Sequence, residues 1–92
     1  MSGAVRRDLP IVNEKGLHAR ASARFVETVE RFDAAATVRR DGMEASGDSI
    51  MGLLMLAASK GSSIEVETRG AEAEALADAL AALVANRFGE DM

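Results

Sequence analysis

The sequence predicts a single α+β domain, an open-faced β-sandwich in which three helices cover one face of a four-stranded antiparallel sheet. Short segments with alternating apolar and polar residues, typical of strands with one wet face, are interleaved with three segments whose apolar residues recur at helical spacing. No repeat or linker divides the 92 residues. The expected order is βαββαβα, a two-layer arrangement over residues 1–92, with flexible ends at 1–5 and 89–92.

The beginning of the chain predicts a strand followed by a helix. Leu9 and Ile11 alternate with more exposed positions, and Pro10 between them lacks an N–H group, which favours the edge of a sheet. Apolar residues change to helical spacing after His18 and continue as far as Phe32. We therefore expect the first helix to begin at or just after His18.

Three further strands are expected in the middle of the chain. Residues 34–40 and 43–46 form a hairpin around Asp41-Gly42, a pair favoured where both turn residues need a positive φ. Residues 64–68 alternate between apolar and polar side chains, which indicates a strand with one wet face.

Two more helices complete the pattern. Ser49 is a candidate cap for the second helix, which we expect to run to about Lys60 and to stop at Gly61. The last helix places its apolar stripe on residues 73–84. It has acidic residues in its first turn, where negative charge interacts favourably with the helix dipole.

Composition excludes several classes of function. The chain has no Cys, and therefore no disulfide, thiolate nucleophile or Cys-based metal site. A net charge of −4 argues against a nucleic-acid partner. The longest apolar run, residues 50–58, is about nine residues long, well below the ~20 that a membrane span needs, and no apolar run near the N-terminus predicts a signal peptide. We expect a cytoplasmic protein with no metal, cofactor, nucleic-acid or membrane partner.

Residues 16–20, Gly-Leu-His-Ala-Arg, are the candidate site. The first N–H groups of a helix lack intrahelical partners and form an anion site. An uncharged imidazole at His18 can attack an electrophile there, and a phosphoryl group on the ring would meet these N–H groups and the Arg20 guanidinium. Gly16 would let the loop backbone approach this site closely.

Spacing alone leaves simpler interpretations open. A solvent-facing cap at His18 and an ordinary surface cation at Arg20 are the commoner meaning of so short a motif. A single His without Cys is a poor basis for a metal site. A hydrolase built on Ser22 and His18 lacks an evident oxyanion site and an orienting carboxylate.

The second helix is apolar almost all round. Ile50, Leu53 and Leu54 lie close together on the helical wheel, with Ala57 on the same side. Met55 and Leu56 broaden this side, and Met51 lies outside it. Most of these side chains belong to the core of a two-layer domain. The surplus predicts an exposed patch for a protein partner, because Met suits surfaces that meet several partners.

Two stretches together resemble the HPr family of phosphocarrier proteins of the bacterial phosphotransferase system. Residues 13–21, followed by Phe25-Val26, resemble the family's active-site signature. Residues 48–56, followed by Lys60-Gly61 and Ile64, resemble its second signature. The resemblance runs from about Leu9 to Leu83.

Within this family the nitrogen-related branch, often called NPr, is especially similar. The similarity to that branch is carried by residues 44–67 and by the acidic tail at residues 88–91. The family's fold is the one that the periodicity predicts.

The resemblance implies a carrier that is not a turnover enzyme. Phosphorylated enzyme I, charged from phosphoenolpyruvate, would phosphorylate Nδ1 of His18, and phospho-His18 would pass the group to a histidine of an EIIA-type protein. Arg20 would stabilise the phosphoryl group in transit. Ser49 matches a regulatory serine that a dedicated kinase modifies in some bacteria. The implied phosphate-binding residues are Gly16, Ala19, Arg20 and Ala21. The implied partner-binding residues are Leu17, Arg20, Arg24, Ser49, Ile50, Met51 and Leu54.

The sequence departs from the family pattern at two positions. Ala21 stands where the family usually has Pro, but Ala is the best helix former, so the helix should remain intact. Asp48 stands where sugar-type members usually have Lys, so a plain helix-cap role for Ser49 fits as well as a kinase site.

Alternative functions use the same elements differently. A regulatory protein-binding module, whose phosphorylation state controls a stress-response or metabolic target, is compatible with the same chemistry. A module that binds without phosphorylation would tolerate loss of His18. An RNA-binding domain of similar topology would need aromatic side chains on its central strands, and the three Phe residues lie elsewhere.

Overall fold

The computed structural model describes residues 3–92, and its elements follow the expected order. The strands are β1 (Val5–Pro10), β2 (Ala35–Arg40), β3 (Met43–Ser46) and β4 (Ser63–Arg69). The helices are α1 (Ala19–Glu30), α2 (Ile50–Met55) and α3 (Ala73–Ala85), followed by the short 3-10 helix η1 (Arg87–Gly89).

The strands form one antiparallel sheet in the order β1-β4-β2-β3. Its centre is the β2–β4 pair, in which Val38 lies opposite Val66. β1 is an edge strand, as Pro10 predicted. The β2–β3 hairpin turns at Asp41 and Gly42, whose φ values of 50° and 80° confirm the expected tight turn.

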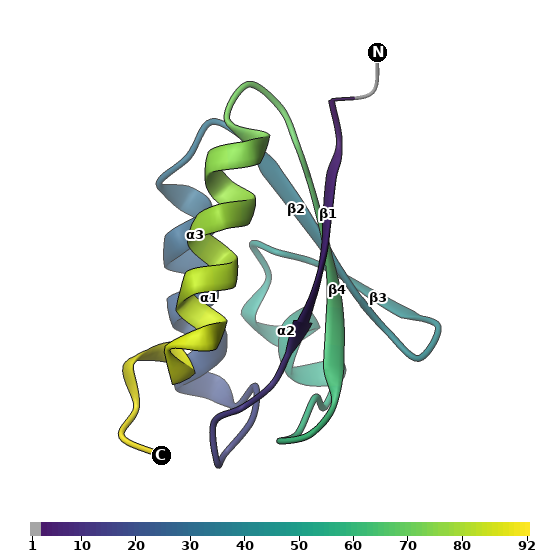
Figure 1. Ribbon diagram of the computed structural model, residues 1–92. Helices are drawn as coiled ribbons and strands as arrows, with labels where there is room; N and C mark the ends of the chain where they lie inside the picture. The colour runs from purple at the N-terminus through teal and green to yellow at the C-terminus, as the bar shows by residue number, and fades with distance from the viewer. Residues whose placement is uncertain (1–2) are drawn as a thin grey trace.

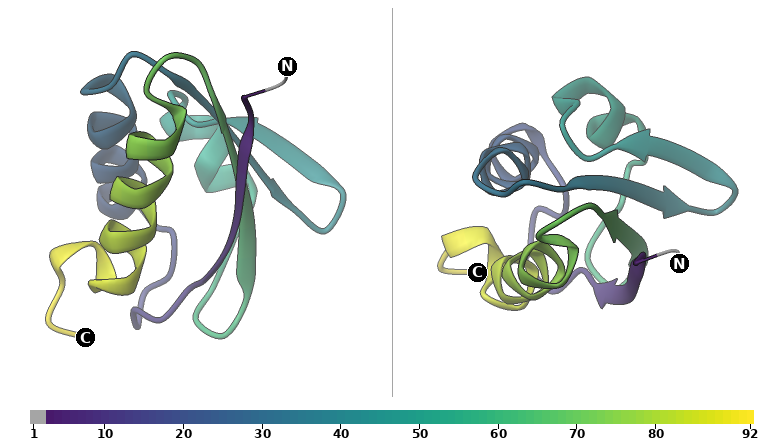
Figure 2. Two further views of the ribbon diagram at one scale, coloured as in Figure 1. Left: turned by 45° about the horizontal axis from the view of Figure 1, so that its top comes forward. Right: turned by 90° about the horizontal axis from the view of Figure 1, so that it is seen from above.

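All three helices lie on one face of the sheet, and the other face is open (Figures 1 and 2). α1 and α3 pack side by side, and α2 lies beside α1 near β3. The core between the layers is formed by large side chains that are at most 1% exposed: Phe25, Val38, Leu53, Val66, Leu80 and Phe88. The predicted fold class is therefore confirmed.

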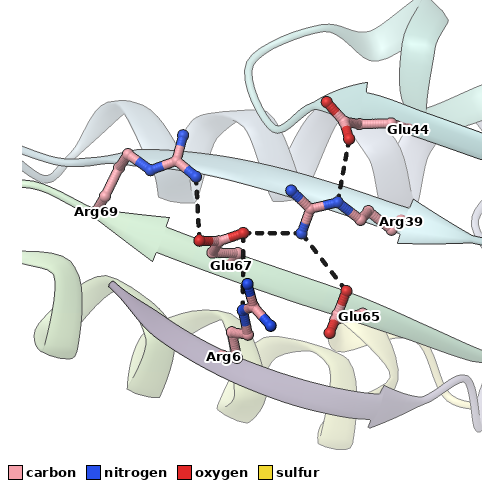
Figure 3. Close-up of polar contacts among 6 residues, drawn as sticks. All are labelled: Arg6, Arg39, Glu44, Glu65, Glu67 and Arg69. Atoms are coloured by element: carbon pink, nitrogen blue, oxygen red, sulfur yellow. Dashed lines mark hydrogen bonds and ion pairs between the residues drawn. The ribbon is translucent and has the colours of Figure 1, made fainter. Parts of the chain in front are cut away.

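The open face of the sheet carries a cluster of charged side chains (Figure 3). This open-face cluster consists of Arg6, Arg39, Glu44, Glu65, Glu67 and Arg69. Glu67 lies at its centre, with a side chain only 8% exposed. Its carboxylate contacts Arg39 at 2.8 Å, Arg69 at 3.1 Å and Arg6 at 3.9 Å. A buried carboxylate is tolerated here because several guanidinium groups surround it.

The second helix is shorter than predicted. It ends at Met55 and does not continue to the stop expected at Gly61. Ala57 takes a φ of 52°, the left-handed conformation that terminates a helix. Arg40 donates from Nη1 to the carbonyl of the capping residue Leu56 at 3.0 Å, so a side chain from β2 satisfies a group that the helix end leaves unpaired.

Both ends were expected to be flexible, and for residues 3–5 and 89–92 that expectation stays a prediction. Residues 1–2 lie outside the described part of the chain. Val5 already pairs with Thr68 in β1, so the first strand begins earlier than the alternation indicated. Near the other end Phe88 is fully buried, and residues 89–92 make hydrogen bonds with the loop before α1.

Candidate functional site

His18 is the N-cap of α1, as its position in the sequence predicted. Its backbone is extended, with φ −82° and ψ −174°, and its carbonyl accepts the N–H of Ser22 at 2.8 Å. Its Nδ1 atom accepts a hydrogen bond from the N–H of Arg20 at 3.2 Å. An N-cap side chain normally accepts such a bond through oxygen. Here the ring nitrogen does so, which requires a lone pair on Nδ1.

The loop before His18 is held against the segment that follows α2. Leu17 donates its N–H to the carbonyl of Ala58 at 2.8 Å. Gly16 has a φ of +68°, and a Cβ atom at this position would lie 2.5 Å from the same carbonyl oxygen. Only glycine fits both conditions, so Gly16 lets the loop lie against the backbone of Ala58. Its expected approach to a group at the His18 site stays a prediction.

A polar chain of contacts links the loop to the C-terminal segment. Asn13 is fully buried and donates from Nδ2 to the carbonyl of Gly16 at 2.8 Å and to Oε1 of Glu90 at 2.9 Å. The other oxygen of Glu90, Oε2, contacts Nε2 of His18. Burial alone raises the pKa of the Glu90 carboxyl, but hydrogen bonds from Asn13 and His18 outweigh it and hold that pKa below its ordinary value.

The C-terminal segment is fixed beside α1 by its backbone. Arg24 donates from Nη1 to the carbonyl of Phe88. Gly89 has a φ of +81°, and a Cβ atom there would lie 2.5 Å from the same Nη1 atom. The carbonyl of Met92 accepts the N–H of Glu14 at 3.0 Å. A pocket between segment and loop is lined by Glu14, Lys15, Arg20, Arg24, Gly89, Glu90, Asp91 and Met92.

The remaining residues of the signature fall into two groups. Ala19 and Arg20 are exposed at the helix start, and Ala21 contributes its backbone there while its side chain is buried. Leu17, which we expected at a partner surface, is instead only 4% exposed. The loop turns its side chain into the core and leaves the ring of His18, 24% exposed, at the surface.

Ser49 is the N-cap of α2. Its Oγ accepts the N–H of Gly52 at 3.0 Å, so the cap role is present in the structure. Asp48 next to it accepts the hydroxyl of Ser46 at 2.6 Å.

The surface of α2 carries exposed apolar side chains, as the surplus on this helix predicted. Met51 and Met55 are 70% and 67% exposed, and Ile50 is 40% exposed. Leu53 is fully buried and Leu54 is half-buried. Because the helix has only six residues, one side chain per turn is enough to anchor it. We refer to Ile50, Met51 and Met55 as the α2 patch.

Within residues 3–92 no group of three or more His, Asp or Glu side chains is placed to hold a metal ion. Over the same residues, none of the helices has the length and apolar character needed to cross a bilayer.

Sequence reasoning missed two residues of the site, Asn13 and Glu90. Asn13 belongs to the signature but was expected only as part of a loop. Glu90 was noted only as part of an acidic tail, and 72 positions separate it from His18. Two residues just before Glu90 could have indicated its position. Phe88 is a large apolar residue that is buried in the core, and Gly89 has a positive φ that turns the chain back toward the domain.

An open-faced sandwich with one histidine at the start of its first helix defines a class, the small phosphocarrier proteins of the phosphotransferase system. A family model described as "PTS HPr component phosphorylation site" matches residues 5–86. The chain therefore belongs to the HPr family, whose members carry phosphoryl groups and are not turnover enzymes.

Relatives with both family names are similar along nearly their whole length. The phosphocarrier protein HPr of Cupriavidus necator is 45% identical over 94% of this chain and 97% of its own. HPr of Neisseria meningitidis serogroup B is 47% identical over 94% of this chain and 97% of its own length. The phosphocarrier protein NPr of Escherichia coli is 40% identical over 95% and 98%.

Solved structures of the family share the fold. HPr from Thermoanaerobacter tengcongensis superposes with a TM-score of 0.90 at 33% identity, over 96% of this chain and 99% of that one. HPr from Bacillus anthracis superposes with a TM-score of 0.84 at 38% identity, over 88% of this chain and 96% of that one.

Proposed function

We propose that this chain carries a phosphoryl group on Nδ1 of His18, taken from phosphorylated enzyme I and passed to a histidine of an EIIA-type protein. The observation that carries the proposal is the hydrogen bond from the Arg20 N–H to Nδ1. It holds a nitrogen lone pair at the N-terminus of α1, where an incoming phosphoryl group is favoured.

The helix start supplies the donors that such a group needs. The N–H groups of Ala19, Arg20 and Ala21 belong to the first turn, where a helix provides no acceptor. Once phosphorylated, the ring would exchange its bond to the Arg20 N–H for bonds from these donors to phosphoryl oxygens. The exposed Arg20 guanidinium can add a charge-assisted bond to the same oxygens. Gly16 contributes by keeping the loop close to the segment after α2.

The partners would dock on the surface around this site. The α2 patch is an exposed apolar surface, and Arg20 and the half-buried Arg24 lie on the neighbouring helix. Apolar contact ringed by Arg is typical of protein interfaces. Leu54, half-buried, would contribute at the edge of the patch, and Ser49 would lie at its beginning.

The proposed branch is the nitrogen-related one, in which phosphorylation controls a regulatory target in the cytoplasm. The resemblance of residues 44–67 and of the acidic tail to the NPr branch supports this assignment. Overall identity does not assign the branch, since relatives named HPr are 40–47% identical to this chain and those named NPr are 40% identical.

Ser49 is proposed as a second, regulatory phosphorylation site for a serine kinase. A phosphoryl group there would sit at the start of α2, a favourable position for negative charge. The adjacent Asp48 carboxylate would repel this phosphoryl group. A kinase that modifies Ser49 would therefore have to accept an acidic residue before the serine, where sugar-type members usually have Lys.

The test of acceptor and branch is a chase experiment. The protein is charged with enzyme I and phosphoenolpyruvate, freed from enzyme I, and mixed with a nitrogen-type or a sugar-type EIIA protein. We expect faster transfer to the nitrogen-type acceptor. A preference for the sugar-type acceptor would overturn the branch assignment. Transfer to neither would overturn the carrier role in favour of a binding module that responds to phosphorylation.

A further inference from the structure

Glu90 and His18 form a contact that the carrier role does not by itself require. Oε2 of Glu90 meets Nε2 of His18, the ring nitrogen opposite the one proposed to carry phosphate. A carboxylate only accepts hydrogen bonds, so this contact places a proton on Nε2. The N–H of Arg20 only donates, so its bond to Nδ1 places a lone pair there. The two contacts select the same tautomer from opposite sides of the ring.

The Glu90 carboxylate is itself held in place. Its second oxygen accepts from Nδ2 of Asn13, a side chain that is fully buried and also bonded to the carbonyl of Gly16. The Glu90 side chain is only 15% exposed. The backbone that presents it is fixed by the buried Phe88 and by the close approach of Gly89 to Arg24. Movement of the Glu90 carboxylate or of the backbone that presents it would therefore break a contact with the rest of the domain.

We propose that Glu90, oriented by Asn13, is a positioning residue for phosphoryl transfer, which holds the proton on Nε2 and so keeps Nδ1 unprotonated for attack. This inference rests on the proposed function of His18. A carboxylate that orients a histidine and faces its developing positive charge is the arrangement that serine hydrolases use on the second ring nitrogen.

The proton and charge balance of the step shows what Glu90 supplies. The Nδ1 lone pair forms a bond to phosphorus while the donor's bond to phosphorus breaks and leaves its electron pair on the donor. The Nε2 proton stays in place, so the phosphorylated ring is an imidazolium that faces the Glu90 carboxylate. In transfer to the acceptor the Nδ1–P bond breaks and His18 leaves as a neutral imidazole, so no proton has to move in either direction.

The charged groups around this pair set its surroundings. Lys15 lies close enough to Glu90 to favour its ionised form, and Arg20 and Arg24 line the same pocket together with Glu14 and Asp91. Among these side chains, Glu90 is the acid that contacts the ring, and its neighbour Asp91 is exposed. Asp91 therefore offers a matched control of the same charge.

The experiment compares Glu90→Ala, Glu90→Gln and Asp91→Ala with the unchanged chain. Nitrogen-15 NMR follows the proton on Nε2 of His18, and a single-turnover assay with phosphorylated enzyme I follows the rate of phosphorylation. In the unchanged chain we expect a directly visible, slowly exchanging Nε2 proton. In Glu90→Ala we expect that proton to exchange rapidly with water and the rate of phosphorylation to fall about tenfold or more, by analogy with the loss of carboxylates that orient metal-binding histidines. Glu90→Gln keeps an acceptor without charge, so it should retain the proton signal with an intermediate rate. Asp91→Ala should keep the slowly exchanging Nε2 proton of the unchanged chain, because the carboxylate that contacts the ring is still present.

The inference would be overturned by a Glu90→Ala protein whose Nε2 proton exchanges as slowly as in the unchanged chain, or one that is phosphorylated as fast as the unchanged chain. Failure of the proposed function is separate. If the unchanged chain accepts no phosphate from a competent enzyme I, the carrier role fails, and the NMR comparison still decides whether Glu90 holds the Nε2 proton.

Discussion

The N–H of Leu17 donates to the carbonyl of Ala58 across 2.8 Å and so joins the loop before His18 to the chain that leaves α2. This bond ties the candidate site to the neighbouring surface, since the same backbone that ends α2 supports the loop. Gly16 makes the approach possible, because any side chain there would meet the Ala58 oxygen.

Gly16→Ala should therefore destabilise the domain. The substitution combines an unfavourable φ of +68° with a contact of 2.5 Å to backbone, and we expect a loss of about 2–4 kcal/mol. Gly61→Ala is the matched control, because its φ is +94° but open space surrounds it, and about 1 kcal/mol is expected there. Urea unfolding of both variants measures the difference. Equal losses would show that the contact with Ala58 is readily relieved.

Arg20→Ala should slow phosphoryl transfer without loosening the fold. Arg20 is exposed, and the hydrogen bond that it makes to Nδ1 of His18 comes from its backbone, which Ala retains. Loss of a charged donor to the transferring group predicts a rate about 100-fold lower. Rapid-quench kinetics measure the transfer rate, and thermal unfolding measures the stability. Arg31→Ala, which removes an exposed cation at the other end of α1, is the control. A marked fall in Tm for Arg20→Ala would assign the side chain a structural role.

Acidification should weaken the domain through Glu67. Hydrogen bonds from Arg39 and Arg69 lower the pKa of this carboxyl below its ordinary value of 4.5. A lowered pKa in the folded state means that the contribution of Glu67 to stability is complete above about pH 4.5 and is lost as the pH falls through the folded-state value.

Glu67→Gln should consequently reduce stability at neutral pH and flatten its decline in acid. Denaturant unfolding from pH 7 to pH 3 measures both, and the two curves should converge at the acid end. Glu27→Gln, an exposed acid on α1, is the control and should follow the unchanged chain. Parallel curves for Glu67→Gln and the unchanged chain would show that the open-face cluster does not couple stability to pH.

The α2 patch should matter for docking and not for folding. Met51 and Met55 are 70% and 67% exposed, so replacing both with Gln removes little buried area. If they contact enzyme I, we expect binding about tenfold weaker, the effect of losing one well-packed interface contact. Calorimetric titration measures the affinity, and Met43→Gln, a 44% exposed Met on β3, is the control. Unchanged affinity in the double variant would move the docking surface elsewhere.

The sequence alone was sufficient for features that depend on neighbours along the chain. The period of apolar residues located all three helices, Asp41-Gly42 predicted its turn, and the position of His18 before a helical pattern predicted the cap. Each of these follows from local backbone preferences or from a face repeated along one element.

Features that depend on tertiary contact were missed. The early end of α2 follows from Ala57 turning left-handed and from the Arg40 side chain, neither of which is encoded in the helix itself. The burial of Leu17 depends on how its loop meets the core. Glu90 reaches His18 only because the chain turns back after α3. The periodicity of apolar residues along the sequence does not predict that the chain turns back toward His18.

The central claim is that Nδ1 of His18 is the atom that carries phosphate. The direct measurement is to incubate the nitrogen-15-labelled protein with enzyme I and phosphoenolpyruvate and to determine by phosphorus and nitrogen NMR which atom is bonded to phosphorus. We expect one phosphoryl group per chain, bonded to Nδ1 of His18 and missing in His18→Ala. Phosphate on Nε2, on another residue, or absent despite a competent enzyme I would contradict the account.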